Sequence, residues 1–292
     1  RLVGKDSPRV ADYLSQALAR GNGGVAFAWP AEIFEKVWTL DSLRRAGYSP
    51  HQPEIRRAAK MIYKAWQLGK EGLSSSIYFR VKDGDDTLVG DTVLRWAGFK
   101  PSYEGVHGFW DTDHFLSYMD ERTASISVNL HGLTALRFQR NPIHNSNIRA
   151  LIGWLRKHRS ADGMFDDKWH ISPYYSLSHA IEAFTGVDNT MAGQCVATLI
   201  KHQHSNGGWG SSGRPSLEET AHSVLGLVLA FRHGMLSNTE PLAKAASFLR
   251  NHMESEPDSR LWIGKTLFRP GGIITALMFG TCYALEQIGY SI

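Results

Sequence analysis

The sequence predicts an all-α protein, an (α/α)6 barrel of about twelve helices arranged in two concentric rings. Two observations lead to this prediction. A helix-like phrase that closes on Gly or Asn recurs six times along the 292 residues, at intervals of about 43 to 55 residues. Segments with a charged face alternate with these phrases, and few runs show the alternation of a strand. An open helical solenoid of the HEAT or armadillo type is the alternative.

The six recurring phrases predict the inner helices. Phrases such as "DTVLRWAGF" and "LGLVLAFRHG" are more apolar than the segments between them. Each phrase ends at a residue that can adopt the left-handed conformation just past a helix, where it satisfies free carbonyl groups. The closing residues are Gly47, Gly98, Asn141, Gly186, Gly234 and Gly289.

The segments with a charged face predict the outer helices. In "SNIRALIGWLRKHR", Ile148, Leu151 and Leu155 fall on one stripe, whereas Arg156 lies off it. Such a helix covers the barrel with its apolar stripe and turns its charges to water. The six predicted outer helices are 8–21, 54–70, 110–120, 146–158, 190–204 and 241–254.

Composition indicates a water-soluble protein with one domain over residues 1–292. The net charge is +4 and its Lys and Arg are scattered, so the chain has no basic stripe for nucleic acid. The apolar stretch 271–285 is too short to span a membrane. Cys195 and Cys282 are isolated, which fits a reducing compartment. We expect a cytoplasmic monomer or homodimer without a signal peptide, with attachment to a membrane surface as an open alternative.

The barrel geometry predicts where a site would lie. In an alternating barrel all inner helices run the same way, so the segments that enter them converge on one rim. Loops on a rigid scaffold are where sites are expected. These segments are rich in aromatic residues, and they are 25–32, 81–87, 125–132, 168–176, 207–220 and 261–272.

One of these segments, "VKDGDDT", holds three aspartates, Asp83, Asp85 and Asp86, at the start of a predicted helix. They could cap the helix, although a cap needs only one Asp. They could bind Mg²⁺ or Ca²⁺, but the pattern lacks the last acid of an EF-hand, and zinc would need His or Cys nearby. They could also hold a proton, because adjacent carboxylates cannot all ionise cheaply. Strong acid beside aromatic rings suits protonation of an alkene and carbocation chemistry.

"DGDDT" resembles the D-x-D-D motif of class II terpene cyclases, the family of squalene–hopene cyclases and copalyl diphosphate synthases. Further blocks resemble the same family in the same order along the chain. They are "WPAEIFEKVWTLDSLRRAGY" (29–48), "SVNLHGL" (127–133), "DKWHISPYYSLSHA" (167–180), "HQHSNGGWG" (202–210), "PSLEETAHSVLGL" (215–227) and "LWIGKTLFRP" (261–270). The combination is far more specific than any one block.

The resemblance implies an α-helical barrel and roles for individual residues. Asp85 matches the middle aspartate, the proton donor, and Asp83 and Asp86 match the acids that tune it. Asn129 matches an Asn that hydrogen-bonds the acid, although it could equally be a helix cap. The aromatic residues that match the lining of the family's cavity are Trp169, Tyr174, Tyr175 and Trp209.

Several of these residues also have structural interpretations. One of the two tyrosines could be core packing, and Trp209 could pin the loop between two helices. His131 and His222 fall near the starts of inner helices, where a structural role is the commoner one. Either histidine could instead take the final proton from the cation.

Two family features are missing from the sequence. The class I motif D-D-x-x-D is absent, and so is the acidic patch that the family uses to bind Mg²⁺ and diphosphate. We therefore expect a single-domain meroterpenoid cyclase of the merosterolic acid synthase type. It would protonate the terminal alkene of a geranylgeranylated aromatic acid and drive polycyclisation. No cofactor is expected, and Mg²⁺ would be needed only for a substrate with a diphosphate.

Two alternatives remain open at this stage. The first is a geranylgeranyl diphosphate cyclase that gives a copalyl-type product. The second is a non-catalytic module that binds an isoprenoid, such as a prenyltransferase β chain. The prenyltransferase chain would need a zinc-binding set, and Asp188 and Cys195 lack the close spacing for one.

Overall fold

A computed structural model describes residues 15–16, 31–69, 72–79, 81–253, 259–263 and 268–292. The chain divides into two units, Arg1–Ala31 and Glu32–Ile292. In the first unit only residues 15–16 and 31 are described, and residues 15–16 are helical. The architecture below is that of the second unit.

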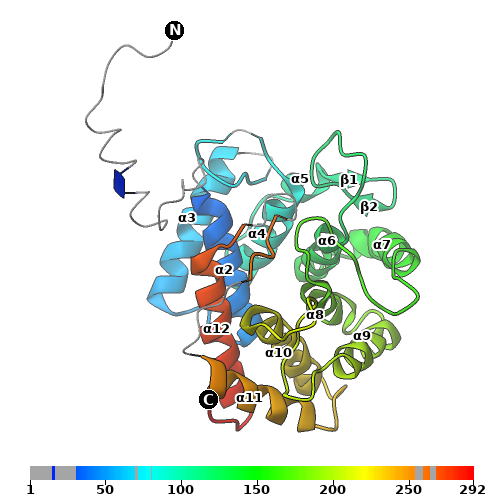
Figure 1. Cartoon of the computed structure of the whole chain (residues 1–292). Coiled ribbons are helices and arrows are strands. Elements are labelled where there is room, and N and C mark those ends of the chain that lie inside the picture. The colour runs from blue at the N-terminus through cyan, green and yellow to red at the C-terminus, as the bar shows by residue number, and fades with distance from the viewer. Residues whose placement is uncertain (1–14, 17–30, 70–71, 80, 254–258, 264–267) are drawn as a thin grey trace. The chain divides into compact units, whose positions relative to one another are not determined.

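Six helices form a closed ring in the second unit (Figure 1). Each packs against the next one in the series, and the last packs back on the first, which excludes an open solenoid for this unit. The six are α2 (Glu32–Ala46), α4 (Gly84–Trp96), α6 (Ile126–Gln139), α8 (Pro173–Phe184), α10 (Leu217–Arg232) and α12 (Gly271–Glu286).

Four further helices of the described chain pack on the outside of this ring. α3 (Pro53–Gly69) lies against α2 and α4, and α7 (Asn145–Lys157), which follows the short η1 (Pro142–His144), lies against α6. α9 (Asn189–Lys201) lies against α8, and α11 (Glu240–His252) against α10. The predicted alternation of inner and outer helices is confirmed for these four pairs.

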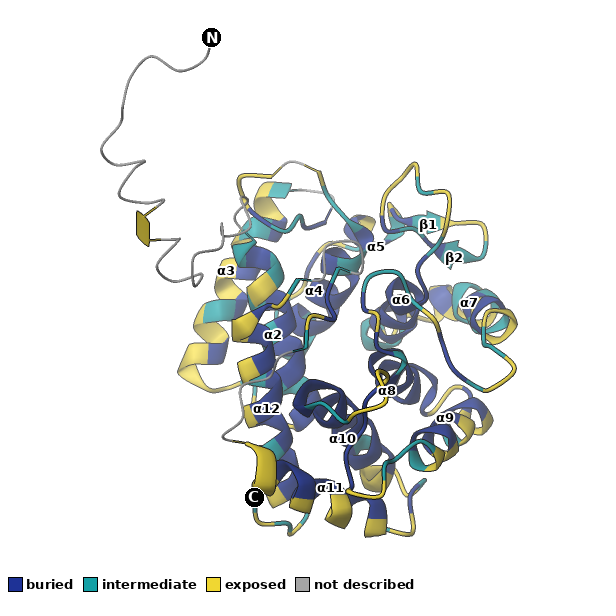
Figure 2. Ribbon diagram, viewed as in Figure 1, coloured by how far each residue is buried: buried dark blue, intermediate teal, exposed yellow. Residues whose placement is uncertain are grey.

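Burial separates the two layers (Figure 2). Thirteen of the sixteen residues of α10 are buried, as expected for a helix with neighbours all round. The outer helix α3 buries Ile55, Ala59, Ile62 and Trp66, which follow one another at helical spacing on one stripe. The charged face of α3 is turned to water.

The helix ends match the sequence closely, with one exception. All five predicted glycines have positive φ, between 70° and 97°. At the sixth position the prediction is wrong, because Arg140 takes the left-handed conformation (φ 51°) and Asn141 is extended. Asn141 instead caps η1 with its side chain.

The prediction of an outer helix over 110–120 is wrong. After the short α5 (Glu104–His107), the chain forms a hairpin of β1 (Trp110–Asp111) and β2 (His114–Phe115). The Asp-Thr-Asp turn between the strands, with Thr112 at φ 49°, stops a helix here. The predicted helix 8–21 lies almost wholly outside the described residues, so a complete ring of outer helices is not seen.

The starts of the inner helices are linked by polar contacts at one end of the ring. Ser125, the N-cap of α6, donates to Asp167 before α8 at 2.7 Å. Ser172, the N-cap of α8, donates to Glu219 of α10 at 2.8 Å. The predicted rim therefore exists for the described segments. Among the described residues, no helix is long and apolar enough to cross a membrane.

Candidate active site

The three aspartates of "DGDDT" occupy three different environments at the start of α4. Asp83 is the N-cap, and its carboxylate accepts a hydrogen bond from the backbone N–H of Asp86 at 2.7 Å. Asp86 is buried, with 2% of its surface exposed. Asp85 is the one that reaches the rim, where its side chain is 18% exposed. Capping therefore accounts for only one of the three.

The electrostatics of this cluster favour bound protons. Burial raises the pKa of Asp83 to about 7, with the charge of Asp85 adding to the effect and the backbone N–H of Asp86 opposing it. Burial raises the pKa of Asp86 well above its ordinary value, and the charges of Asp83 and Asp85 raise it further. Asp83 and Asp86 therefore do not both carry a charge at neutral pH.

Asp85 pairs with a histidine from the neighbouring inner helix. Its Oδ1 lies 2.6 Å from Nδ1 of His131 on α6. The other ring nitrogen of His131, Nε2, lies 3.3 Å from the hydroxyl of Tyr175 on α8. Burial, and then the charge of Asp85, raise the pKa of Tyr175 well above its ordinary value, so the phenol keeps its proton. The three side chains form one chain of hydrogen bonds behind the acid.

Asn129 does not contact the acid as the sequence suggested. Its Oδ1 accepts from the backbone N–H of Phe115 at 2.7 Å, and its Nδ2 donates to the carbonyls of Phe115 (3.0 Å) and Ser125 (2.8 Å). Both donor hydrogens are thereby used. The N-cap of α6 is Ser125, so the capping interpretation of Asn129 is wrong as well. Asn129 instead ties β2 to α6.

Aromatic rings surround the Asp85–His131 pair. Trp38 of α2 meets the His131 ring edge to face, with centroids 5.0 Å apart, and lies 5.4 Å from Trp262. Tyr175 is 2% exposed, and Tyr174 is also buried. Trp38 and Trp262 were not singled out from the sequence, although both stand in blocks that resemble the family.

Two further aromatic residues lie at the rim. Trp169 is half-buried and donates its indole N–H to Ser117 at 2.9 Å. Tyr118, which was not predicted, meets Trp169 edge to face at 6.1 Å and is 39% exposed. Burial raises the pKa of Tyr118, and the three aspartates raise it further, so its hydroxyl also keeps its proton.

Trp209 lies in the packing between α9 and α10. It is fully buried, its indole N–H donates to the carbonyl of Leu199 at 2.8 Å, and its backbone N–H donates to Thr220 at 3.0 Å. The structure therefore favours the interpretation in which Trp209 pins the loop between two helices.

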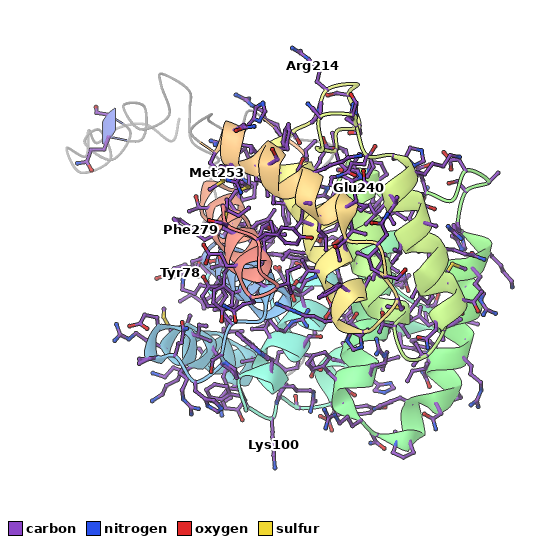
Figure 3. All side chains as sticks on the ribbon, turned by 90° about the horizontal axis from the view of Figure 1, so that it is seen from below. Tyr78, Lys100, Arg214, Glu240, Met253 and Phe279 are labelled. Carbon is purple, nitrogen blue, oxygen red and sulfur yellow. The ribbon has the colours of Figure 1, made fainter. Side chains whose placement is uncertain are left out.

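Exposed apolar side chains precede the aspartates. Tyr78 is 80% exposed, Ile77 54% and Val81 53%, and Met119 in the next rim segment is 67% exposed. Figure 3 shows Tyr78 projecting from the surface, as Phe279 does on α12. These residues give the segments next to the aspartates in the sequence an exposed apolar surface.

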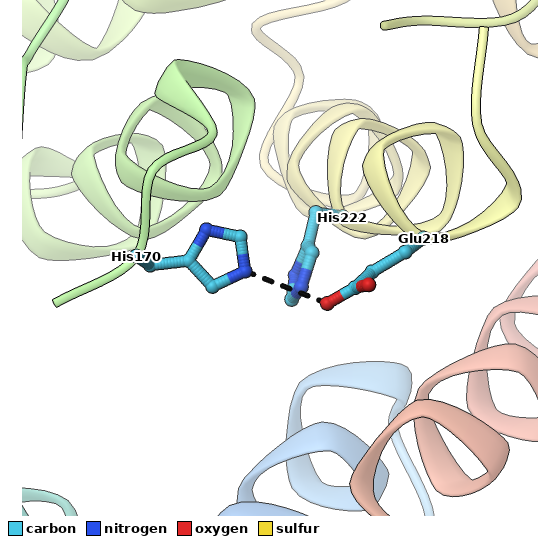
Figure 4. Close-up of side chains that lie close together, drawn as sticks. All are labelled: His170, Glu218 and His222. Carbon is cyan, nitrogen blue, oxygen red and sulfur yellow. Dashed lines mark ion pairs between the residues drawn. The ribbon is translucent and has the colours of Figure 1, made fainter. Parts of the chain in front are cut away.

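A second polar cluster lies on the other face of Tyr175, whose ring stacks on His170 with centroids 4.0 Å apart (Figure 4). The ligand-type atoms of His170, Glu218 and His222 lie within 4.8 Å of one another, and all three residues are buried. Neither ring nitrogen of His222 has a hydrogen-bond partner among the described residues. Burial lowers the pKa of His222 well below its ordinary value, so the ring is neutral.

The ligand types of this cluster suit a divalent transition metal, but the tautomer of His170 does not. Nδ1 of His170 accepts the backbone N–H of Ser172 at 3.3 Å, so the proton of a neutral ring is on Nε2. Nε2 lies 3.5 Å from Oε1 of Glu218, which also accepts the indole N–H of Trp262 at 2.6 Å. A metal at this point would meet an N–H instead of a lone pair.

No family model matches the chain. A type B diterpene cyclase of Mycobacterium tuberculosis is 30% identical over 96% of this chain and 56% of its own length. An ent-copalyl diphosphate synthase from Streptomyces platensis has a similar structure, with a TM-score of 0.81 and 26% identity over 97% of this chain and 56% of that one.

Over nearly its whole length, the chain is similar to class II terpene cyclases. It spans just over half the length of these two relatives. A type II terpene cyclase from Scytonema, solved in complex with geranylgeranyl dihydroxybenzoate, shares the fold, with a TM-score of 0.63 and 13% identity over 88% of each chain. The predicted closeness to meroterpenoid cyclases is therefore not supported, because the identity to the ent-copalyl diphosphate synthase is twice as high.

Proposed function

We propose that Asp85 is the general acid of a class II diterpene cyclase that acts on geranylgeranyl diphosphate and gives a copalyl-type product. The observation that carries the proposal is the 2.6 Å contact between Asp85 and His131 at the rim of the ring. It gives one carboxyl of the motif a buried hydrogen-bond partner and leaves that carboxyl partly exposed. Neither capping nor core packing requires that arrangement.

The direction of the hydrogen bonds suits an acid. In the arrangement we propose, the Tyr175 hydroxyl donates to Nε2 of His131, 3.3 Å away, which puts the proton of the neutral ring on Nδ1. Nδ1–H then donates to Oδ1 of Asp85, and the second carboxyl oxygen carries the proton that goes to the alkene. Once it leaves, the new carboxylate already has an N–H donor and the helix N-terminus beside it.

The rim offers the environment that a carbocation needs. Tyr118 lies close enough to the three aspartates for their charges to raise its pKa, and its ring packs edge to face with Trp169. Aromatic rings attract cations. Net chemistry is an isomerisation, because the proton taken from Asp85 is balanced by the proton lost from the cyclised cation.

We assign the substrate from the relatives. The absence of the acidic patch that binds Mg²⁺ and diphosphate in the family is given less weight. The M. tuberculosis relative is a diterpene cyclase and the S. platensis structure is an ent-copalyl diphosphate synthase. A geranylgeranylated aromatic acid is the second candidate, supported only by the fold shared with the Scytonema enzyme. A non-catalytic binding module is the third, and it gives no reason for an acid paired with histidine.

The three aspartates do not suit Mg²⁺. Asp83 is committed to capping, Asp85 to His131, and Asp86 is buried with a raised pKa. In the proposed reaction the aspartates therefore act as acids and not as metal ligands. With a diphosphate substrate, Mg²⁺ would act on the head group and not on the acid.

A direct assay tests the proposal. Purified protein is incubated with geranylgeranyl diphosphate or with geranylgeranyl dihydroxybenzoate, with and without Mg²⁺, and products are identified by mass spectrometry. We expect cyclic product from the diphosphate, and none from the Asp85→Asn variant. Turnover of the benzoate alone would favour the second candidate, whereas activity in the variant would sink the assignment of the acid.

A further inference from the structure

His179 lies directly behind His131 inside the ring. The two rings meet edge to face, with centroids 4.6 Å apart and planes at 81°. His179 is 4% exposed and comes from α8, the helix that also provides Tyr175. Nothing in the sequence singled it out, because its contacts depend on how α6 and α8 pack.

The protonation state of His179 is fixed by Arg45 of α2. The guanidinium lies 3.1 Å from Nε2 of His179. A guanidinium can only donate, so Nε2 is an acceptor without a proton. Burial, and then the charge of Arg45, hold the pKa of His179 well below its ordinary value. His179 is therefore a neutral ring between a cation and His131.

Arg45 is itself held in place by other buried groups. It donates to the hydroxyl of Ser178 at 2.7 Å and to Glu182 at 3.0 Å. Glu182 also pairs with Arg44 at 2.5 Å, and Arg44 pairs with Asp41 at 2.7 Å. The contact with His179 is the one that directs the Arg45 guanidinium toward His131, whereas Ser178 and Glu182 bind its other N–H groups.

We infer that Arg45 and His179 are positioning residues for the acid: they keep the shared proton of the Asp85–His131 pair on the carboxyl. The inference rests on the proposed function. Arg45 is a fixed positive charge one ring away from His131, so it disfavours an imidazolium there. His179 maintains that distance and holds the His131 ring between Asp85 and Tyr175.

Other titratable groups surround the pair and stay unchanged in the test below. They are Asp83 and Asp86 on α4, Asp41 on α2, Tyr175 on α8, His222 on α10, and Tyr118 and Asp167 in the rim segments. The acids among these groups stabilise the shared proton whether it lies on Asp85 or on His131. Arg45 differs because it lies on the His131 side of the pair. Its charge therefore disfavours a proton on His131 more than a proton on Asp85.

Two substitutions of His179 separate this role from simple packing. His179→Phe fills the space but leaves the Arg45 N–H without an acceptor, so the guanidinium turns toward Glu182 and away from His131. We expect kcat/KM to fall about tenfold on its low-pH plateau at an unchanged KM, because the shared proton moves to His131. The loss of kcat/KM with rising pH should move to higher pH, because a cation no longer disfavours the proton-bound pair. His179→Gln restores an acceptor and should restore the wild-type pH profile.

A matched control is His144, another buried histidine with a tyrosine partner. Its Nδ1 lies 3.0 Å from the hydroxyl of Tyr103, and it belongs to η1, which follows the C-terminal end of α6. His144→Phe should lower the melting temperature about as much as His179→Phe and leave the pH profile unchanged. A wild-type profile in folded His179→Phe would overturn the inference, and so would an equal shift in His179→Gln.

A measurement on the unmodified protein covers the case in which a variant fails to fold. Nitrogen NMR of labelled histidines should show His179 neutral, with an unprotonated Nε2, at every pH at which the protein stays folded. Protonation of His179 near pH 6.5 in the folded protein would overturn the inference. Failure of the proposed function is seen separately, because it would appear as activity in Asp85→Asn.

Discussion

The ring holds two clusters of buried charge that are built on opposite principles. At the rim, three like charges crowd together, and the pKa values of Asp83 and Asp86 rise. Deeper in the ring, two arginines face two acids, and Arg44 and Arg45 lower the pKa of Glu182 to about 2 against the cost of its burial. Balanced charges stay ionised and hold helices together. Crowded carboxyl groups without a counter-charge instead keep bound protons, which can be donated.

The largest effect is expected from a change of Asp85, the partly exposed residue of the aspartate cluster. Asp85→Asn keeps the shape of the side chain but has no proton to donate. We expect turnover to fall by about 10³-fold or more. The melting temperature should change little, because Asp85 is neither the cap nor part of the core. Assays of product formation and thermal unfolding on the same sample measure the two outcomes.

The next largest effect is expected in the cluster of opposite charges formed by Arg44, Arg45, Asp41 and Glu182. Glu182→Gln leaves Arg44 and Arg45 short of a buried counter-charge, so the free energy of unfolding should fall by about 3 kcal/mol. The folded pKa of about 2 lies below the ordinary value of 4.5, so the wild type should lose the stability due to Glu182 as pH falls from 4.5 toward 2. The variant should lack that component. Denaturant unfolding between pH 2 and 7 measures it, and an unchanged acid limb would contradict the assignment.

A smaller effect distinguishes the two residues near the acid on α6. His131→Phe removes the donor to Asp85 and should reduce kcat by about 10²-fold. Asn129→Ala should instead destabilise the fold by about 1–3 kcal/mol, because Phe115 backbone groups lose buried partners. Steady-state kinetics and unfolding curves for both variants test this division. Equal kinetic defects at matched stability would mean that Asn129 acts on the acid after all.

The smallest effect concerns stability at the rim and has the opposite pH dependence. Asp83 has a folded pKa of about 7, above its ordinary 3.8, so its contribution is complete below about pH 3.8 and is lost as pH rises through 7. Asp83→Asn keeps a capping side chain and removes this loss. Between pH 4 and 8 the variant should gain about 1–2 kcal/mol relative to the wild type. Urea titrations at the two pH values would show it.

Much of the fold followed from local patterns in the sequence. Helix ends depend on neighbouring residues, so the glycines that end the inner helices were predicted from their spacing. Layer assignment depends on apolar periodicity, which α3 and α10 display clearly. The hairpin around Thr112 was missed because its aromatic residues mimic a helix stripe, and the turn residues between them decide the outcome.

The site was less accessible to sequence reasoning, because it depends on register and on long-range packing. Asn129 and His131 are two positions apart, and only the cap at Ser125 decides which one turns toward Asp85. His179 and Trp262 reach the pair only after the ring has closed. Asp85 itself was predicted from its motif, because the motif is local in the sequence.

The β1–β2 hairpin stands where an outer helix was predicted. It sets the spacing between α4, which carries Asp85, and α6, which carries His131. The backbone of Phe115 is bonded to Asn129 on α6, and two residues later the carbonyl of Ser117 accepts the N–H of Gly84 on α4 at 2.8 Å. A Cβ on Gly84 would lie 2.2 Å from the carbonyl oxygen of Leu116, and one on Gly132 would lie 2.3 Å from the Phe115 ring. Three consecutive residues thus set how far α4 stands from α6. The place where the chain departs from its own repeat is the place where its geometry is most tightly fixed.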